Sequence, residues 1–439
     1  MYRNRMRNRG VLYMKDETLC LHAGYEPENG SPGVMPIVQS TTYRFDSTER
    51  IGDIFDHPTE AYIYSRFANP TVDAVEKKIA ALEGGVGAMC TSSGQAANLF
   101  AVLNLCSAGD SLICSSAIYG GTINLFAVTL KRFGIECIFV SPEATDEELD
   151  AAFKENTKCV FGETIANPAL VVCDIEKFAN AAHRHGVPFL IDNTFATPVL
   201  CKPFEFGADI VTHSTTKYMD GHAVQGGGVI VDSGNFDWTT PEAMQKFPEF
   251  TEPDASYHGT VYTEEFGRSA YIVKCRMQLM RDFGAYPSAH SAFLLNLGLE
   301  TLAVRMPRYC ANALAVAKFL SSSDKVESVS YPGLEGDREH ALAEKYLKGH
   351  GSGVISFVIK GGKEKAVQFM DSLHLACNEV HVADIRSCVL HPASETHRQL
   401  TDEQLVAAGI NPGMIRFSCG LENIDDILDD IKRALAKVK

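Results

Sequence analysis

The chain has 439 residues, of which 45% are hydrophobic and 22% are charged, as expected for a folded protein of more than one domain. Its formal net charge of −15 argues against a general binder of nucleic acid or of anionic membranes, because a phosphate-rich surface would repel it. No apolar run approaches the roughly 18 residues that a membrane helix needs. Its 13 cysteines stand singly, with no Cys-x-x-Cys pair and no zinc-like spacing. We therefore expect reduced thiols, a cytoplasmic location and no metal site.

Residues 1–68 are typical of an extended arm rather than of a domain. The first 13 residues carry arginines but lack the apolar segment of a secretory signal. Residues 20–60 then mix glycine, proline and polar residues with few periodic runs. Arms of this kind pack on a partner subunit, so we expect an oligomer. Near the end of the arm, Tyr64 and Arg66 could both donate to one phosphate group if the segment is extended; a surface arginine is the alternative.

Residues 69–288 predict a large α/β domain. A helical pattern of apolar residues begins near Asn69 and ends at a glycine pair. Strand and helix patterns then alternate, which predicts a mostly parallel sheet flanked by helices. Residues 237–270 break this rhythm, and we expect an irregular insertion or a long loop with short helices. The strands are predicted at residues 88–90, 111–114, 137–140, 159–161, 188–191, 209–211 and 228–231, and helices include residues 95–106, 124–133 and 175–185.

Residues 289–439 predict a smaller α+β domain. Leucines at helical spacing mark residues 289–320 as a long helical region, and residues 354–359 form a continuous apolar run typical of a strand. The chain ends in an amphipathic helical pattern over residues 424–438.

An acid and an amine follow two predicted strands of the large domain. Asp192 ends the strand at 188–191, and Lys217 follows the next strand, after Ser214 and Thr216. Open α/β sheets bind ligands at the carboxyl ends of their strands. A lysine amine, a carboxylate and several hydroxyls there suggest pyridoxal phosphate, with the lysine bonded to it, the carboxylate on its ring nitrogen and the hydroxyls on its phosphate. A surface lysine and a helix-capping aspartate are the alternatives for each residue taken alone.

Four further residues fit such a site without requiring it. Gly94 opens a predicted helix, where the backbone N–H groups favour an anion, although an ordinary serine cap is the alternative. Tyr119, before two glycines, could stack on a planar cofactor or pack in a turn. Asn167, before a proline, could bond a cofactor oxygen. Arg416 lies in an apolar strand and needs an anion, either a substrate carboxylate or a structural partner.

Together these motifs resemble the Cys/Met-metabolism family of pyridoxal-phosphate enzymes, which have the fold called type I. The resemblance covers residues 17–435. It is carried by Tyr64-Ser-Arg66, Ser93-Gly94, Tyr119-Gly120, Asp192-Asn-Thr194, Ser214-Thr-Thr-Lys217 and His391-Pro-Ala-Ser394.

The resemblance implies a role for each residue of the site. Lys217 would hold the cofactor and move protons, Asp192 would pair with the ring nitrogen, and Tyr119 would stack on the ring and assist. Asn167 would lie near the cofactor's phenolic oxygen. The phosphate would be bound by Ser214, Thr216, Gly94 and Gln95, joined by Tyr64 and Arg66 of the partner subunit, and the substrate by Arg416 and Ser387, with Tyr64 of the partner subunit beside them.

Within the family the chain is most similar to O-acetylhomoserine sulfhydrylases, through the segment 229–259 and its overall length. This implies a γ-replacement in which O-acetyl-L-homoserine and sulfide or a thiol give L-homocysteine or methionine and acetate. It also implies a homotetramer built from dimers with shared sites. The alternatives are a methionine γ-lyase, which typically has a cysteine in place of Gly121, a cystathionine γ-synthase or γ-lyase, and a fold that has lost catalysis. Several residues that border the expected substrate site are unusual for the family, namely Ala223-Val-Gln-Gly226, His381, Ala383, Arg386 and Cys388.

Overall fold

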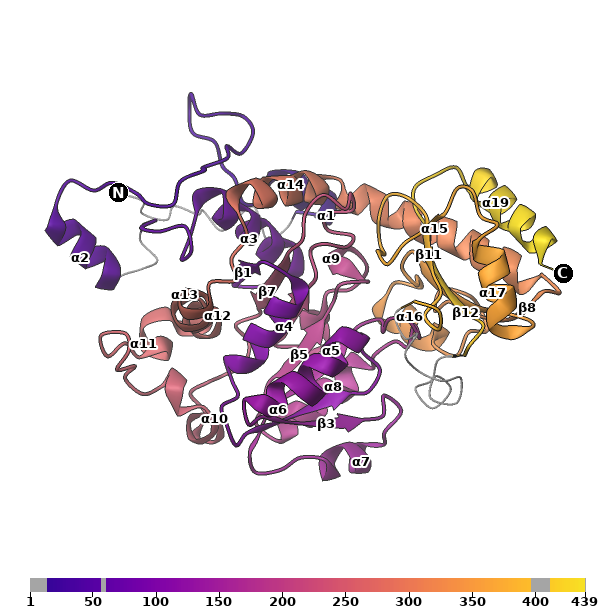
Figure 1. The fold of residues 1–439 in the computed structure, drawn as a ribbon. Coiled ribbons are helices and arrows are strands. Elements are labelled where there is room, and N and C mark those ends of the chain that lie inside the picture. Colours follow the sequence, from indigo (N-terminus) through magenta and orange to yellow (C-terminus); the bar gives the residue numbers. More distant parts are fainter. Residues whose placement is uncertain (1–13, 57–60, 396–410, 439) are drawn as a thin grey trace.

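The protein contains two β-sheets of unequal size, connected by one long helix (Figure 1). The structure, a computed structural model, describes residues 14–56, 61–395 and 411–438. The arginine-rich residues 1–13 therefore lie outside the described residues.

The large sheet has seven strands in the order β1-β7-β6-β5-β4-β2-β3. Strands β3, β2, β4, β5 and β6 run parallel, whereas β7 runs antiparallel to both of its neighbours. The mostly parallel sheet is thus confirmed, and every predicted strand is present. The strands are β1 (Gly87–Thr91), β2 (Ser111–Ser115), β3 (Glu136–Val140), β4 (Thr157–Glu163), β5 (Phe189–Asp192), β6 (Ile210–His213) and β7 (Gly228–Asp232).

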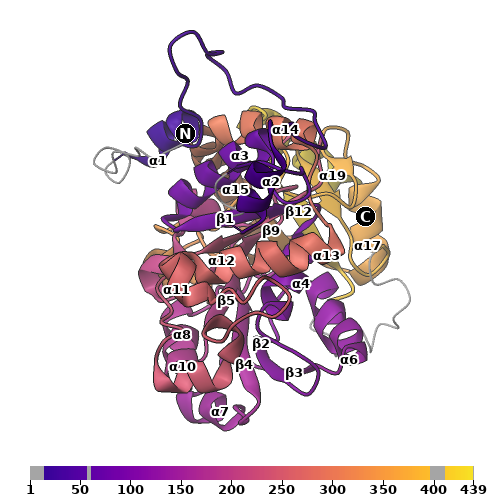
Figure 2. The same cartoon turned by 90° about the vertical axis from the view of Figure 1, so that its left-hand side faces the viewer.

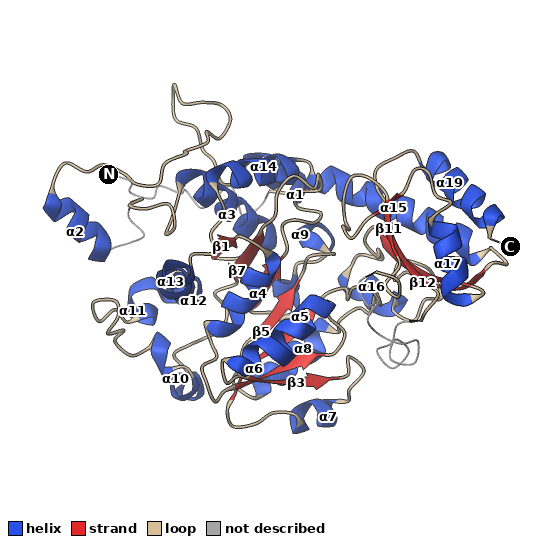
Figure 3. Cartoon of the chain, in the orientation of Figure 1, coloured by secondary structure: helices blue, strands red, loops and turns tan. Residues whose placement is uncertain are grey.

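Helices flank the large sheet, as Figure 3 shows. Helix α3 packs on β1, α4 on β6 and β7, and α8 on β4 and β5. A π-helical turn at Leu125–Thr129 joins the fifth helix to the sixth, so the predicted single helix is interrupted there. The helices are α3 (Pro70–Glu83), α4 (Gly94–Leu103), α5 (Gly120–Asn124), α6 (Leu130–Arg132), α7 (Asp146–Ala151), α8 (Ile175–Arg184) and α9 (Thr197–Leu200).

The ends of α3 follow from its sequence. The side chain of Asn69 accepts a hydrogen bond from the N–H of Thr71 at 2.9 Å, which satisfies a donor that the first helical turn leaves free. Pro70, at the first helical position, lacks the N–H that would otherwise be unpaired there. Gly84 ends the helix with φ of 81°, a left-handed conformation that glycine adopts without strain.

Two regions contain more helix than the sequence pattern predicts. The arm contains α1 (Asp16–His22) and α2 (Thr48–Asp56), and Figure 1 shows α2 standing away from both sheets. In Figure 2, turned by 90°, α2 lies on the side that faces the viewer. Residues 237–288 are a set of short helices around aromatic side chains, in which Trp238 stacks on Phe250 with ring centroids 4.1 Å apart. These helices are α10 (Pro241–Lys246), 3₁₀ turns at Pro248–Phe250 and Gly267–Ser269, α11 (Tyr262–Phe266), α12 (Ala270–Cys275), a π-helical turn at Arg276–Met280 and α13 (Arg281–Phe283).

The small sheet has five strands in the order β10-β11-β12-β9-β8, which confirms a smaller C-terminal sheet. Helix α15 (Leu302–Ser321) passes from one core to the other: Cys310 packs in the large core, and Ala313 in the small one. A domain boundary at residue 289 therefore stays a prediction. The other elements are α14 (Ala289–Glu300), β8 (Val326–Ser330), α16 (His340–Tyr346), β9 (Val354–Ile359), α17 (Gly362–Met370), β10 (Cys377–Asn378), β11 (Cys388–Leu390), β12 (Met414–Ser418) and α19 (Ile424–Lys437).

All 13 cysteines are free, and Cys377 is the one that is exposed. In the part of the chain that the structure describes, no helix combines the length and the apolar character needed to cross a membrane.

Candidate active site

The candidate site begins where three parallel strands end side by side. Glu163 at the end of β4 pairs in register with Asp192 at the end of β5, and Asp192 pairs with Thr212 on β6. Lys217 follows β6 after a turn of three residues. The sheet therefore brings two carboxylates and the predicted lysine loop to one edge, the carboxyl edge where such sheets bind ligands.

The carboxylate of Asp192 is buried and fully engaged. Its Oδ1 accepts the N–H of Thr194 at 3.0 Å and also the threonine hydroxyl, and its Oδ2 accepts from Nδ2 of Asn98 at 3.2 Å. Asn98 in turn accepts from the hydroxyl of Thr212 at 2.6 Å, and Thr194 accepts from the N–H of Ser214 at 2.8 Å. We call these five residues the Asp192 network. It fixes the position of the carboxylate before any ligand arrives.

Glu163, at the end of β4, is a second buried carboxyl group at the same edge of the sheet. Burial, and secondly the charge of Asp192, hold the pKa of the Glu163 carboxyl well above its usual range. Its Oε2 accepts the backbone N–H of Tyr119 at 2.5 Å. The raised pKa favours the protonated form of Glu163, and its bond to Tyr119 holds the start of α5 in place.

Lys217 is largely buried, and its surroundings favour the neutral amine. Burial, and secondly the charge of Arg416, lower its pKa from 10.5 to about 8. Its carbonyl accepts the N–H of Gly221 at 2.8 Å, which closes the loop that carries it. A neutral amine is the form that attacks an aldehyde and that accepts a proton, so this lysine is suited to both.

The loop before Lys217 and the start of α4 lie in close contact. A Cβ on Gly94 would lie 2.6 Å from the Cβ of Ser214, so only glycine permits this approach. The first N–H groups of α4 have no partner within the helix. N–H groups, a helix start and a serine side chain at one place fit a phosphate group.

Arg416 lies on β12, buried and without a carboxylate partner. Its Nη2 donates to the carbonyls of Val380 and His381 at 3.2 and 2.9 Å, and its Nη1 donates to Oδ1 of Asn167 at 3.3 Å. Among the residues described, no ion pair involves Arg416 and its Nε has no hydrogen-bond partner. Burial lowers its pKa, so this site would gain from an anion. A structural ion pair, the alternative to a substrate carboxylate, is not present in the described part.

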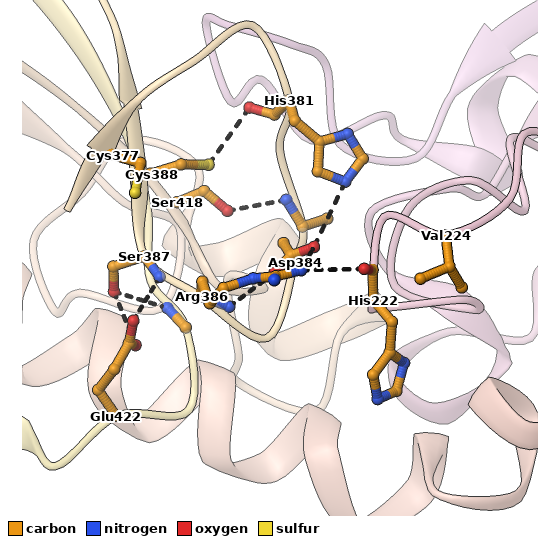
Figure 4. A network of polar contacts seen from close by, with 12 residues as sticks. His222, Val224, Cys377, His381, Asp384, Arg386, Ser387, Cys388, Ser418 and Glu422 are labelled. Atoms are coloured by element: carbon orange, nitrogen blue, oxygen red, sulfur yellow. Dashed lines mark hydrogen bonds and ion pairs between the residues drawn. The ribbon is translucent and has the colours of Figure 1, made fainter. Parts of the chain in front are cut away.

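Residues 380–388, the 380–388 loop, contact both Arg416 and the segment that follows Lys217. Figure 4 shows this loop with Asp384, Arg386 and His222 labelled. The N–H of Ile385 donates to the carbonyl of Gly221 at 2.8 Å. Arg386 donates to Oδ1 of Asp384 at 2.8 Å and to the carbonyl of His222 at 2.9 Å. These contacts hold the small sheet against the loop of Lys217.

The predicted site residues do not all come together. Lys217, Asp192, Ser214, Gly94, Tyr119, Asn167 and Arg416 are linked by the contacts above, and Gln95 lies beside Gly121 with its Oε1 buried and unpartnered. The hydroxyl of Thr216 donates to the carbonyl of Gly227 at 3.2 Å and accepts that residue's N–H at 3.0 Å, so binding a phosphate would require it to exchange partners.

Ser387 lies away from the strand position that pairs with Arg416. Leu390 is the residue of β11 that pairs with Arg416, and Ser387 lies three positions earlier, about 10 Å along the strand. Its hydroxyl is fully buried and donates to Glu422 at 2.9 Å. Ser387 thus fixes the 380–388 loop to the segment after β12, and its role on the substrate carboxylate stays a prediction.

Tyr64 and Arg66 lie in the arm, beside α13. Arg66 donates to the carbonyl of Arg281, and its guanidinium lies 5.5 Å from the centre of the Tyr64 ring. Their role on the phosphate of a partner subunit stays a prediction.

The structure adds residues that the sequence analysis passed over. Asn98 follows Gly94 by four positions, one helical turn, so its side chain projects from the same face of α4 toward the site. That spacing is a usable signal. Glu163 has no sequence signal of its own, and its carboxyl becomes informative only once β4 and β5 are seen in register.

Comparisons with known proteins agree with this geometry. The model of the family described as Cys/Met metabolism PLP-dependent enzyme matches residues 17–436. The chain belongs to this family. Its cofactor is accordingly pyridoxal phosphate, and the Asp192 network, Lys217 and the Gly94–Ser214 contact fit that group.

Relatives of this family member match along nearly the whole chain. Homocysteine synthase of Schizosaccharomyces pombe is 47% identical over 95% of this chain and 97% of its own length. O-acetyl-L-homoserine sulfhydrylase of Leptospira meyeri is 43% identical over 97% of both chains. The metY protein of Campylobacter jejuni, a candidate O-acetylhomoserine (thiol)-lyase, superposes with a TM-score of 0.92 at 37% identity, covering 96% of this chain and all of its own. Its crystal structure contains a pyridoxyl-lysine phosphate residue.

Proposed function

We propose that the protein catalyses a γ-replacement in which O-acetyl-L-homoserine and sulfide or a thiol give L-homocysteine, or methionine, and acetate. The names of the relatives at 43–47% identity support this reaction. The observation that carries it is that Lys217 and Arg416 lie near each other. Lys217 is a largely buried amine of lowered pKa, and Arg416 is a buried guanidinium that lacks a carboxylate partner among the residues described.

Each end of this site suits one part of an amino-acid substrate. Arg416 would bind the α-carboxylate through two parallel N–H donors, which supplies the anion that its buried charge needs. Lys217, whose pKa is about 8, would accept and return a proton at the α-carbon near neutral pH. Pyridoxal phosphate, when bound, supplies the electron sink that makes such a proton removable. Asp192 would hold the ring nitrogen in its protonated form, and Tyr119 would cover the ring.

The environment around Gly121 favours replacement over the lyase alternative. A Cβ on Gly121 would overlap the ring of Tyr119 and lie 2.7 Å from Nε2 of Gln95. The cysteine typical of methionine γ-lyases would not fit here unless Tyr119 moved. The metB protein of Corynebacterium glutamicum also superposes, with a TM-score of 0.81 at 33% identity over 98% of this chain, both values lower than those of the metY protein.

We further propose a homotetramer built from dimers, in which Tyr64 and Arg66 of the partner subunit complete the phosphate site. The position of both residues on the arm, next to α13 rather than beside Lys217, supports this arrangement. The 13 free thiols support a reducing compartment such as the cytoplasm.

A product assay tests the reaction. The protein loaded with pyridoxal phosphate is given O-acetylhomoserine with and without sulfide, and methionine alone in a parallel sample. Sulfide-dependent homocysteine with little ketobutyrate from methionine is the expected result. Rapid ketobutyrate from methionine would instead establish a γ-lyase.

A further inference from the structure

His381 occupies a fixed position beside Arg416 and Lys217. Its carbonyl accepts from Nη2 of Arg416 at 2.9 Å and from Sγ of Cys388 at 3.3 Å. The N–H of Ala383, two residues on, donates to the hydroxyl of Ser418 at 2.8 Å. The backbone of His381 is therefore held on both sides, which fixes the point from which its ring projects.

The ring of His381 has an unused nitrogen next to a fixed carboxylate. Its Nε2 is buried, has no hydrogen-bond partner among the described residues and lies 3.8 Å from Oδ2 of Asp384. Asp384 is 1% exposed and is held in place by Arg386. Figure 4 shows Nε2 directed toward Asp384 and Nδ1 on the edge of the ring farther from that carboxylate. This orientation leaves Nδ1 free to meet a ligand.

The charges around the ring favour neutral imidazole. Burial is the largest effect that lowers the pKa of His381, followed by the charge of Lys217. Arg416 and Arg386 lower it further, and only Asp384 raises it. A neutral ring has a lone pair that can accept a proton, and Asp384 would stabilise the cation that results.

We propose that His381 takes the proton from the sulfur nucleophile as the sulfur attacks the γ-carbon of the substrate. This inference rests on the proposed γ-replacement. Acetate leaves with the electron pair of its C–O bond. In the same net exchange, one sulfur lone pair forms the S–Cγ bond that replaces the C–O bond, while the S–H electron pair stays on sulfur and the proton goes to Nδ1. Lys217 serves the α-carbon, so a second base for the sulfur divides the proton transfers between two groups.

His381→Asn tests the assignment, because an amide keeps the polarity and the planar shape but accepts no proton near neutral pH. We expect kcat/KM for a weakly acidic alkanethiol at pH 7 to fall about 10²-fold or more at saturating O-acetylhomoserine. The loss should be smaller for a more acidic thiol, and it should shrink as the pH rises and thiolate forms in solution. The visible absorbance of the cofactor, and its change on adding O-acetylhomoserine alone, should match those of the wild type.

Two controls keep the result decisive. His374→Asn removes an exposed histidine of the same small-sheet region and should leave every rate unchanged. His381→Gln repeats the test if the asparagine variant binds the cofactor poorly. An equal loss for all thiols, or wild-type rates and pH profile in both variants, would overturn the role of His381. Wild-type protein that makes no thioether or homocysteine from O-acetylhomoserine would instead overturn the proposed function.

Discussion

The two ends of the site meet at Lys217 but are built differently. At the end formed by the large sheet, both oxygens of the central carboxylate, Asp192, have hydrogen-bond partners within the Asp192 network, although Oε1 of nearby Gln95 is buried without one; we call this the satisfied end for its carboxylate. At the end formed by the small sheet, Nε of Arg416 and Nε2 of His381 are buried without a partner among the described residues. An unsatisfied buried polar group costs about 1–3 kcal/mol, so it persists where a ligand can supply the missing bond. The satisfied end suits a resident cofactor, and the unsatisfied end suits a substrate that comes and goes.

Lys217→Ala should have the largest effect, because this amine belongs to both ends. We expect turnover to fall by about 10⁴-fold or more and the covalent link to the cofactor to be lost. Absorbance spectra and mass spectrometry after hydride reduction check the link, and the product assay checks turnover. Near-normal turnover in this variant would contradict the whole site assignment.

Asp192→Asn should weaken the satisfied end alone. Because the charge on the ring nitrogen is lost, we expect kcat to fall about 10²- to 10³-fold while KM for O-acetylhomoserine changes little. The amide can still bond within the Asp192 network, so the fold should be kept. Steady-state kinetics measure kcat and KM, and circular dichroism checks the fold. A change confined to KM would contradict the place of Asp192 at the cofactor.

Arg416→Lys should weaken the unsatisfied end alone. Lysine keeps the charge but loses the planar pair of donors, so we expect kcat/KM to fall about 10²-fold, chiefly through KM. The cofactor spectrum should not change. If this variant lost its cofactor and kept its KM, the distinction between the two ends would be wrong.

The pH dependence of cofactor attachment tests the state of Lys217. Since its pKa is lowered to about 8, the rate of covalent attachment to the apoprotein should rise through pH 8 and level off above it. The unfolded chain, with the ordinary value of 10.5, binds this proton more tightly. The contribution of Lys217 to apoprotein stability should therefore increase between pH 8 and 10.5. Attachment that kept rising toward pH 10.5 would mean an ordinary, solvated lysine.

The smallest effect concerns two left-handed alanines near the unsatisfied end. Ala383 and Ala223 have φ of 65° and 57°, a conformation that costs an alanine about 1–2 kcal/mol more than a glycine. After the greater flexibility of unfolded glycine is subtracted, Ala383→Gly should stabilise the protein by about 0.5–1 kcal/mol. Ala366→Gly, within α17, is the matched control and should destabilise by about 1 kcal/mol. Denaturant unfolding measures both variants, and a change of the same sign in their free energies of unfolding would contradict the strain at Ala383.

The sequence predicted the satisfied end better than the unsatisfied one, for a physical reason. Asp192 and Lys217 follow strands whose buried apolar residues mark them clearly, and parallel strands bring their ends together whatever the loops do. The β-sheet order, the antiparallel β7 and the register of Glu163 with Asp192 depend on long-range pairing that local patterns do not contain.

The contacts of the 380–388 loop were harder to predict from the sequence. Ser387 and His381 are six positions apart in one irregular loop, and no periodicity indicates which side chain faces Arg416. The family resemblance implied the serine, whereas the register of β11 with β12 places its backbone about 10 Å along the strand from the residue that pairs with Arg416. Burial of Ser387 by Glu422 is likewise a contact between distant segments.

Cys377 gives this loop a built-in attachment point for a fluorescent label. It is the exposed thiol among 13, and it pairs across β10 and β11 with Cys388, whose Sγ donates to the carbonyl of His381. A maleimide dye should therefore react fastest at Cys377 in the native protein, ahead of the partly exposed Cys137, with no cysteine removed by mutation. Its emission would follow the arrival and departure of each substrate beside Arg416 in real time.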